Sequence, residues 1–261
     1  MKSHEARDLI TRLVERTTGF RVQVARDPSL ETLGTVRMAR ASSPYHLIRY
    51  NSSAEDILDY VVSFECGFVL RQVGVPPEKR YEVGPSTKGK REVARLVQST
   101  FGPNNSITLP ETAQSTLSAQ LLGGLITQLR SIPLALRIDH WLLKEYSGLR
   151  DQQNTACLRQ LQDGIAVLDP RVRRSMPTQI AEASVAMNAA QALYWVDVWG
   201  DEHAAVPYKA AGLLSEGASL LRLWEEIPSS AIHDRELIDA WGKHLGIADW
   251  YEFVPYDGGA G

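Results

Sequence analysis

The stretch from Ser53 to Val73 constrains the fold more than any other. It predicts a helix that is apolar on nearly every side and yet carries a carboxylate, Glu65, near its middle. The positions three and four residues before and after Glu65 share its helix face. All four are apolar: Val61, Val62, Phe68 and Val69. Because an unpaired charge on such a face is unfavourable, we expect Glu65 to be protonated, paired with a basic group or bound to a metal.

Composition indicates a soluble globular protein. The chain has 261 residues, enough for one large domain or two small ones. Its hydrophobic content of 44% and charged content of 23% are ordinary for that class. The formal net charge of −3 argues against a dominant nucleic-acid footprint, although it leaves room for a local basic patch.

The sequence favours a cytoplasmic location. The two cysteines, Cys66 and Cys157, fall in predicted helices and form no disulfide framework, which favours a reducing compartment. The N-terminal stretch is charged and amphipathic, unlike a signal peptide. No uninterrupted apolar run approaches the ~18 residues of a membrane span. We expect no contact with a membrane.

The order of predicted elements indicates an α+β fold. A helix from Ser3 to Thr17 is followed by three short strands with turn residues between them. The strands are Arg21 to Ala25, Leu33 to Ala39 and Tyr45 to Tyr50. We expect a small three-stranded sheet packed on the long central helix. The polar stretch from Glu78 to Lys90 contains Gly and Pro and predicts a loop.

From Glu111 onward the strand signal almost disappears, which predicts a mainly helical, bundle-like part. Prolines and glycines separate the predicted helices, which cover 111–131, 134–147, 149–166, 177–199, 208–226 and 233–246. We therefore divide the chain at Asn104-Asn105, into an α+β domain of residues 1–104 and an all-helical domain of residues 105–261.

The segments "YHLIRYN" and "DYVVSFECGFVLR" carry a family resemblance. Together with the order of elements, the N-terminal part resembles the zinc-metallopeptidase domains of the ImmA/IrrE type, within the gluzincin group. In that family an edge strand precedes a helix with the motif His-Glu-x-x-His, whose histidines bind zinc and whose glutamate is the general base. The motif glutamate corresponds to Glu65, and the two histidine positions correspond to Phe64 and Phe68.

This departure from the motif implies a scaffold that has lost its zinc. Phenylalanine cannot ligate a metal, so the expected cofactor is none, and Phe64 and Phe68 fill the space of metal and water. Glu65 is then a relic, or it pairs with a base such as Arg49 on the preceding strand. The resemblance implies a third ligand on a following helix, and Glu92 lies at a plausible distance. Such inactive modules act as binding or regulatory subunits, so a protein partner is expected.

A hydrolase is the first alternative. It would use Glu65 as the catalytic residue with a non-standard ligand set, and the fallback zinc ligands are then His46, Glu65, Cys66 and Glu92. Elsewhere, Asp139 and His140 are adjacent on a helix and point about 100° apart, so they do not face each other. We interpret them as part of a surface helix end.

A nucleic-acid-associated factor is the second alternative. Its binding residues would come from the basic segment 79–95, where Lys88, Lys90, Arg91 and Arg95 could also contact an acidic partner. Gly84 to Lys90 in the same segment has the spacing of a phosphate-binding loop. Because Pro85 removes a backbone donor and Arg91 stands where Ser or Thr is needed, we interpret this stretch as a solvated basic loop.

Overall fold

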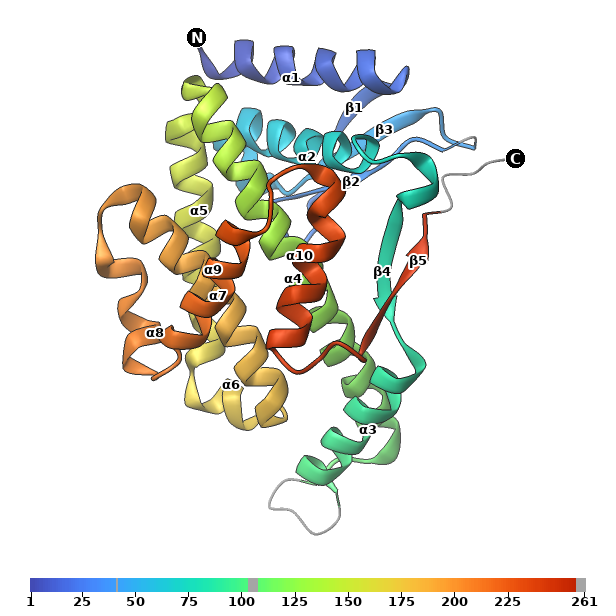
Figure 1. Cartoon of the computed structure of the whole chain (residues 1–261), viewed down its shortest axis with the longest axis vertical. Coiled ribbons are helices and arrows are strands. Elements are labelled where there is room, and N and C mark those ends of the chain that lie inside the picture. The colour runs from blue at the N-terminus through green and yellow to red at the C-terminus, as the bar shows by residue number, and fades with distance from the viewer. Residues whose placement is uncertain (41, 103–107, 257–261) are drawn as a thin grey trace. The chain divides into compact units, whose positions relative to one another are not determined.

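The computed structural model describes residues 1–40, 42–102 and 108–256. It confirms the α+β class with a mainly helical remainder (Figure 1). The chain forms two compact units, and each is discontinuous in sequence. Unit 1 contains Met1–Tyr81, Leu134–Gln160 and the C-terminal residues from Pro255, and unit 2 contains Glu82–Pro133 and Leu161–Val254. The predicted boundary at Asn104-Asn105 lies outside the described residues.

Unit 1 contains the predicted three-stranded sheet. After α1 (Ser3–Thr18) come β1 (Arg21–Arg26), β2 (Gly34–Arg37) and β3 (Tyr45–Tyr50), close to their predicted positions. The strand order is β1-β3-β2, with β1 parallel and β2 antiparallel to β3. The strand that precedes the central helix is therefore the middle strand. The resemblance implies an edge strand at this position, and that implication is wrong, because β1 and β2 both pair with β3.

The central helix is confirmed as the hub of unit 1. The Asn51 side chain accepts a hydrogen bond from the Ser53 backbone and begins a 3₁₀ turn, η1 (Ser52–Ile57), which continues into α2 (Leu58–Val73). One side of α2 packs on α1 and another on β2 and β3. At Gly67 an added Cβ would lie 2.5 Å from Ile138 Cγ2, so the missing side chain lets α4 (Glu111–Glu145) cross closely.

The predicted loop from Glu78 to Lys90 is wrong. This segment contains a 3₁₀ turn, η2 (Pro77–Lys79), strand β4 (Tyr81–Pro85) and the first turn of α3 (Thr87–Phe101). β4 pairs with β5 (Tyr251–Pro255), a partner far away in the sequence. Local composition cannot report such a partner, which explains the error.

Most of the remaining helices follow the prediction, with three exceptions. The sequence predicted no helix at 170–174, where the structure has the short helix α6. Pro133 lies inside the continuous helix α4 and does not separate two helices. Gly212, with a positive φ of 74°, divides the predicted helix 208–226 into two. The other helices are α5 (Arg150–Ile165), α6 (Pro170–Arg174), α7 (Thr178–Trp199), α8 (Val206–Ala210), α9 (Leu214–Glu226) and α10 (Asp234–His244). Short 3₁₀ turns connect some of them: η3 (Ser147–Leu149), η4 (Ala166–Leu168), η5 (Glu202–Ala204) and η6 (Ala231–His233).

Within the described part of the chain, α4 alone is long and apolar enough to pass a length-and-composition test for a membrane span. Of its apolar window, 56% is buried inside the structure, and core helices of soluble proteins pass the same test. This feature is compatible with a soluble protein.

Candidate functional site

Glu65 lies on the side of α2 that faces the sheet. Its side chain is 7% exposed, and its Oε1 would be 3.4 Å from a Cβ added to Gly34 of β2. The same added Cβ would lie only 2.5 Å from Val61 Cγ1. Glycine at position 34 thus allows α2 to approach the strand and brings the carboxylate against it. Glu65 has an interaction partner in the structure.

The two phenylalanines at the motif's histidine positions belong to an aromatic row on α2. The ring centroids of Tyr60 and Phe64 are 5.6 Å apart, and those of Phe64 and Phe68 are 5.3 Å apart in an edge-to-face arrangement. Both phenylalanines pack against the core of unit 1. They contribute packing to this core.

His46 has a structural role in the sheet. It is 2% exposed, and its Nδ1 accepts a hydrogen bond from the Ala39 backbone at 3.1 Å. Its Nε2 lies 3.0 Å from Thr18 Oγ1 at the end of α1. Because Nδ1 is an acceptor, the neutral ring carries its proton on Nε2 and donates to Thr18. Burial lowers the pKa of His46, which favours this neutral form.

The remaining members of the fallback metal set do not join it. Cys66 is fully buried, and burial raises the pKa of its thiol to about 12, with the nearby Glu65 charge acting in the same direction. Glu92 lies on α3, in unit 2, and pairs with Arg95 at 2.6 Å. Among the described residues no three His, Cys, Asp or Glu side chains form a group that could hold a metal. His46, Glu65, Cys66 and Glu92 are therefore not assembled as a ligand set.

The predicted basic residues are partly neutralised. Arg49 projects from the sheet face opposite Glu65 and pairs with Asp27 at 2.9 Å, so the suggested Arg49–Glu65 pair is wrong. Lys88 pairs with Asp249, and Arg95 pairs with Glu92. Lys90 and Arg91 are exposed. The basic segment is a mixed-charge helix surface, which weakens the expectation of a nucleic-acid footprint.

The phosphate-loop spacing has a structural explanation. Ser86 caps α3 by accepting a hydrogen bond from the Gly89 backbone at 2.9 Å, and its hydroxyl donates to the Asp249 carbonyl. A Cβ added to Gly89 would lie 2.2 Å from the Trp250 carbonyl oxygen. The chain before β5 therefore presses on the first turn of α3, and glycine is required there for packing.

A second buried carboxylate, Asp139 of α4, is the site residue that sequence reasoning placed wrongly. Its Oδ1 accepts hydrogen bonds from Tyr60 Oη at 2.9 Å and from Gln153 Nε2 at 2.7 Å. Asp139 is fully buried where α2 and α5 pack against α4, so its interpretation as part of a surface helix end is wrong. His140, its neighbour, is half-buried.

Two oxygen atoms near Asp139 receive no hydrogen bond from the described residues. Within the described structure, Asp139 Oδ2 and Gln153 Oε1 are buried without a hydrogen-bond partner. Burial raises the pKa of Asp139 to about 7, although the hydrogen bonds from Gln153 and Tyr60 act in the opposite direction. The Cys157 thiol lies 4.0 Å from Tyr60 Oη, and burial raises its pKa well above the ordinary value.

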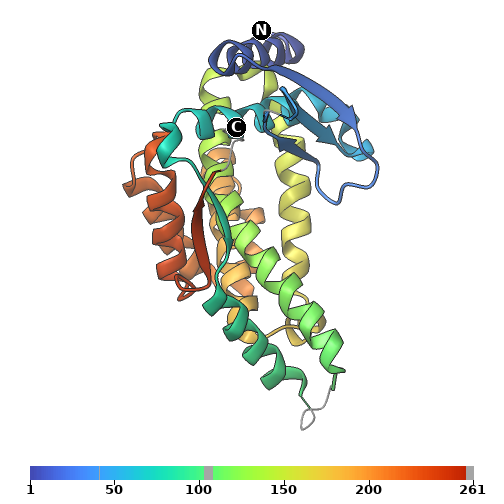
Figure 2. The ribbon, with the colours of Figure 1, turned by 90° about the vertical axis from the view of Figure 1, so that its right-hand side faces the viewer.

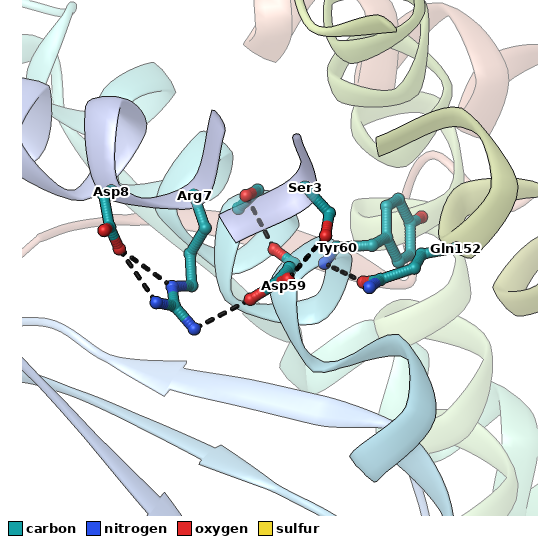
Figure 3. A network of polar contacts seen from close by, with 7 residues as sticks. Ser3, Arg7, Asp8, Asp59, Tyr60 and Gln152 are labelled. Carbon is teal, nitrogen blue, oxygen red and sulfur yellow. Dashed lines mark hydrogen bonds and ion pairs between the residues drawn. The ribbon is translucent and has the colours of Figure 1, made fainter. Parts of the chain in front are cut away.

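A more exposed polar network joins α1 to the first turn of α2. Figure 3 shows Arg7 between two carboxylates, with distances of 2.7 Å to Asp59 and 2.9 Å to Asp8. Ser3 donates a further hydrogen bond to Asp59 at 2.8 Å. Gln152 of α5 accepts a hydrogen bond from the Tyr60 backbone at 2.9 Å (Figure 3). These contacts hold α1 and α5 on α2 and position Tyr60 for its bond to Asp139.

Comparison of the chain with protein-family models, curated proteins and solved structures finds no match.

Proposed function

We propose that this chain is a non-catalytic, metallopeptidase-like protein that acts as a binding or regulatory subunit of a protein assembly. The observation that carries the proposal is the chemistry of α2. Phe64 and Phe68 stand where the resembling family has zinc ligands, and their rings pack against each other. Glu65, between them in sequence, is 7% exposed against β2.

The surroundings of Glu65 support a structural use of the carboxylate. His46, a candidate base in the fallback set, uses both ring nitrogens in hydrogen bonds to Ala39 and Thr18. The Cys66 thiol, with a pKa of about 12, stays protonated at neutral pH. A general base or nucleophile needs a free, reactive form near neutral pH, which neither group offers.

Elemental analysis of protein purified without chelator and without a metal-binding tag tests the proposal. We expect clearly substoichiometric zinc and other transition metals. One zinc per chain would overturn the proposal and favour the alternative, a hydrolase with a non-standard ligand set.

A variant that restores the motif tests the resemblance separately. The double substitution Phe64→His and Phe68→His recreates the two ligand positions one helical turn apart. The matched control is Arg12→His with Arg16→His, an exposed pair at the same spacing on α1. A peptidase-like scaffold places a third ligand beside these two positions, and this ligand cannot be Glu92, which pairs with Arg95 in unit 2. On such a scaffold, competition with a chromogenic chelator should show zinc bound at least about tenfold more tightly by the first pair. Equal affinity of the two folded variants would contradict a peptidase-like scaffold.

A further inference from the structure

Strand β1 is an open edge of the sheet in unit 1. It pairs with β3 on one side, and no strand of the described chain pairs with its other side. Five of its six residues are exposed, and Val24 is 45% exposed although it is apolar. Figure 2 shows β1 in dark blue along the outside of the sheet. An exposed strand edge is a ready template for another extended chain.

The direction of the backbone groups on this edge follows from two hydrogen bonds. The Asp27 N–H donates to the Tyr50 carbonyl of β3, and the Val22 N–H donates in the other direction, to Glu15 of α1 at 3.0 Å. Backbone groups alternate sides along a strand, so Val22, Val24 and Arg26 face the open edge. Glu15 occupies the first of these donors, and the N–H and C=O groups of Val24 and Arg26 face outward beyond it.

The charges beside this edge are mainly basic. Arg21 and Arg26 stand at the two ends of β1 and both are exposed, and Arg26 pairs with the exposed Glu55 at 3.2 Å. On α1, Arg12 and Arg16 are exposed and line a shallow open depression of about 460 Å³ together with Leu9 and Glu15. Since Glu15 also contacts Val22, the depression lies beside the β1 edge. Leu9, 50% exposed, adds an apolar contact there.

A second copy of β1 is a poor fit to this edge. Because Val22, Val24 and Arg26 face outward in both copies, a symmetric antiparallel pair is centred on Val24 and sets Val22 of each copy opposite Arg26 of the other. The Val22 N–H already donates to Glu15 in each copy, so such a pair loses a backbone hydrogen bond at both ends. A separate extended strand meets this loss only once, and acidic ends complement the arginines beside the edge.

We propose that the open edge of β1 binds an extended, acidic segment of a partner protein by strand addition. The inference rests on the proposed function and identifies the class of partner. Backbone groups of Val24 and Arg26 supply the hydrogen bonds, and Val24 with Leu9 supplies the apolar contact. Arg21, Arg26 and the arginines of α1 select acidic side chains.

A synthetic peptide with the sequence acetyl-Glu-Thr-Val-Thr-Val-Glu-amide tests the proposal. Aligned antiparallel to Arg21–Arg26, it places a glutamate opposite each arginine and a valine opposite Val24. We expect saturable binding by fluorescence anisotropy of the labelled peptide, and slower hydrogen exchange at the Val24 and Arg26 amides. A peptide with lysines in place of both glutamates should not bind. Absence of binding at millimolar acidic peptide overturns the proposal.

Protein variants separate strand addition from simple charge attraction. Val24→Pro removes an outward N–H and leaves the bonds to β3, so binding should fall at least about tenfold. Arg21→Glu should weaken the acidic peptide and admit the lysine peptide. Arg37→Glu on β2, the exposed matched control on the other edge strand, should change neither. If Val24→Pro fails to fold, a peptide with proline in place of its central valine tests the same hydrogen bond from the other side.

Failure of strand addition and failure of the proposed function give different experimental results. Tight binding that is unchanged by Val24→Pro and by the proline peptide would overturn strand addition. Zinc content does not depend on β1, so a stoichiometric metal would overturn the non-catalytic proposal and leave the peptide result as it stands.

Discussion

Two carboxylates of unit 1 lie on apolar helix faces, and their polar surroundings differ. Glu65 of α2 is 7% exposed beside β2 and has an interaction partner. Asp139 of α4 is fully buried, with two donors on Oδ1 and, among the described residues, none on Oδ2. Burial alone therefore does not decide whether an acid is charged. The number of hydrogen-bond donors around each carboxylate oxygen decides its protonation state.

Burial of Asp139 makes the stability of the folded protein depend on pH. Burial raises the pKa of Asp139 from 3.8 to about 7 in the folded protein. A raised folded-state pKa means that the folded protein binds the proton more tightly than the unfolded chain. The stabilising contribution of this proton is fully present below about pH 4 and is lost as the pH rises through about 7. Tyr60 and Cys157, the titratable side chains in contact with this cluster, stay neutral over that range because burial raises both pKa values.

The largest expected effect is that of Asp139→Asn. Asparagine keeps an oxygen for Tyr60 and Gln153 and removes the charge. A pKa difference of about three units at ~1.4 kcal/mol per unit gives a stability gain of about 4 kcal/mol over the wild type above pH 8, and little gain at pH 4. Urea unfolding of both proteins from pH 4 to 9 measures the difference. A difference that does not grow with pH would show that Asp139 is already charged and satisfied.

The second effect concerns Gly67, which lies in α2, and Gly34, which lies in the strand β2 that packs against α2. Gly67→Ala and Gly34→Ala each place a Cβ 2.5 Å from a neighbouring side-chain carbon, of Ile138 and Val61 respectively. We expect each to destabilise the protein by about 1–3 kcal/mol, measured by chemical denaturation. Gly123→Ala in α4 is the matched control, because a Cβ there meets no atom within 4 Å. It should stabilise by up to about 1 kcal/mol, and the same gain at Gly67 would contradict the close crossing of α2 and α4.

The third effect is that of Glu65→Gln, which should have the opposite sign to Asp139→Asn. Because Glu65 has an interaction partner, loss of its charge should destabilise the protein by about 1 kcal/mol near neutral pH. Thermal and urea unfolding at pH 7 measure this change. A stabilised variant would make Glu65 a second unsatisfied acid and remove the distinction between the two sites.

The smallest effect is expected from the thiols, which report on the two sites independently. Cys66 lies next to Glu65, and Cys157 lies in the Asp139 cluster. Both are buried with raised pKa values, so the folded protein should not react with a thiol reagent at pH 8 on the timescale of an unfolded control. Rapid labelling of Cys157 alone would show that the Asp139 cluster opens more readily than the Glu65 site.

Local pattern predicted much of unit 1. The alternation in Arg21 to Ala25 and Tyr45 to Tyr50 gave the correct strands, and the cap at Asn51 with the apolar run to Val73 gave α2. The errors share one cause, which is dependence on distant residues. β4 exists because β5 pairs with it, and Gly89 reflects contact with Trp250. Arg49 lies on the face opposite Glu65, because side chains alternate along β3 and its neighbours Ile48 and Tyr50 face the core.

The sequence by itself indicated the burial of Glu65, whereas Asp139 was wrongly interpreted as a surface residue although the same rule applies to it. The positions three and four residues on either side of Asp139 are Ala135, Leu136, Leu142 and Leu143, as apolar as those around Glu65, so the rule that identified Glu65 also identifies Asp139. Only the tertiary structure decided what each acid does. Tyr60 and Gln153 reach Asp139 from other helices, Gly34 comes from a strand, and helix periodicity carries no record of such partners. The pKa of a buried acid depends on these neighbours, because they supply or withhold the donors that replace water.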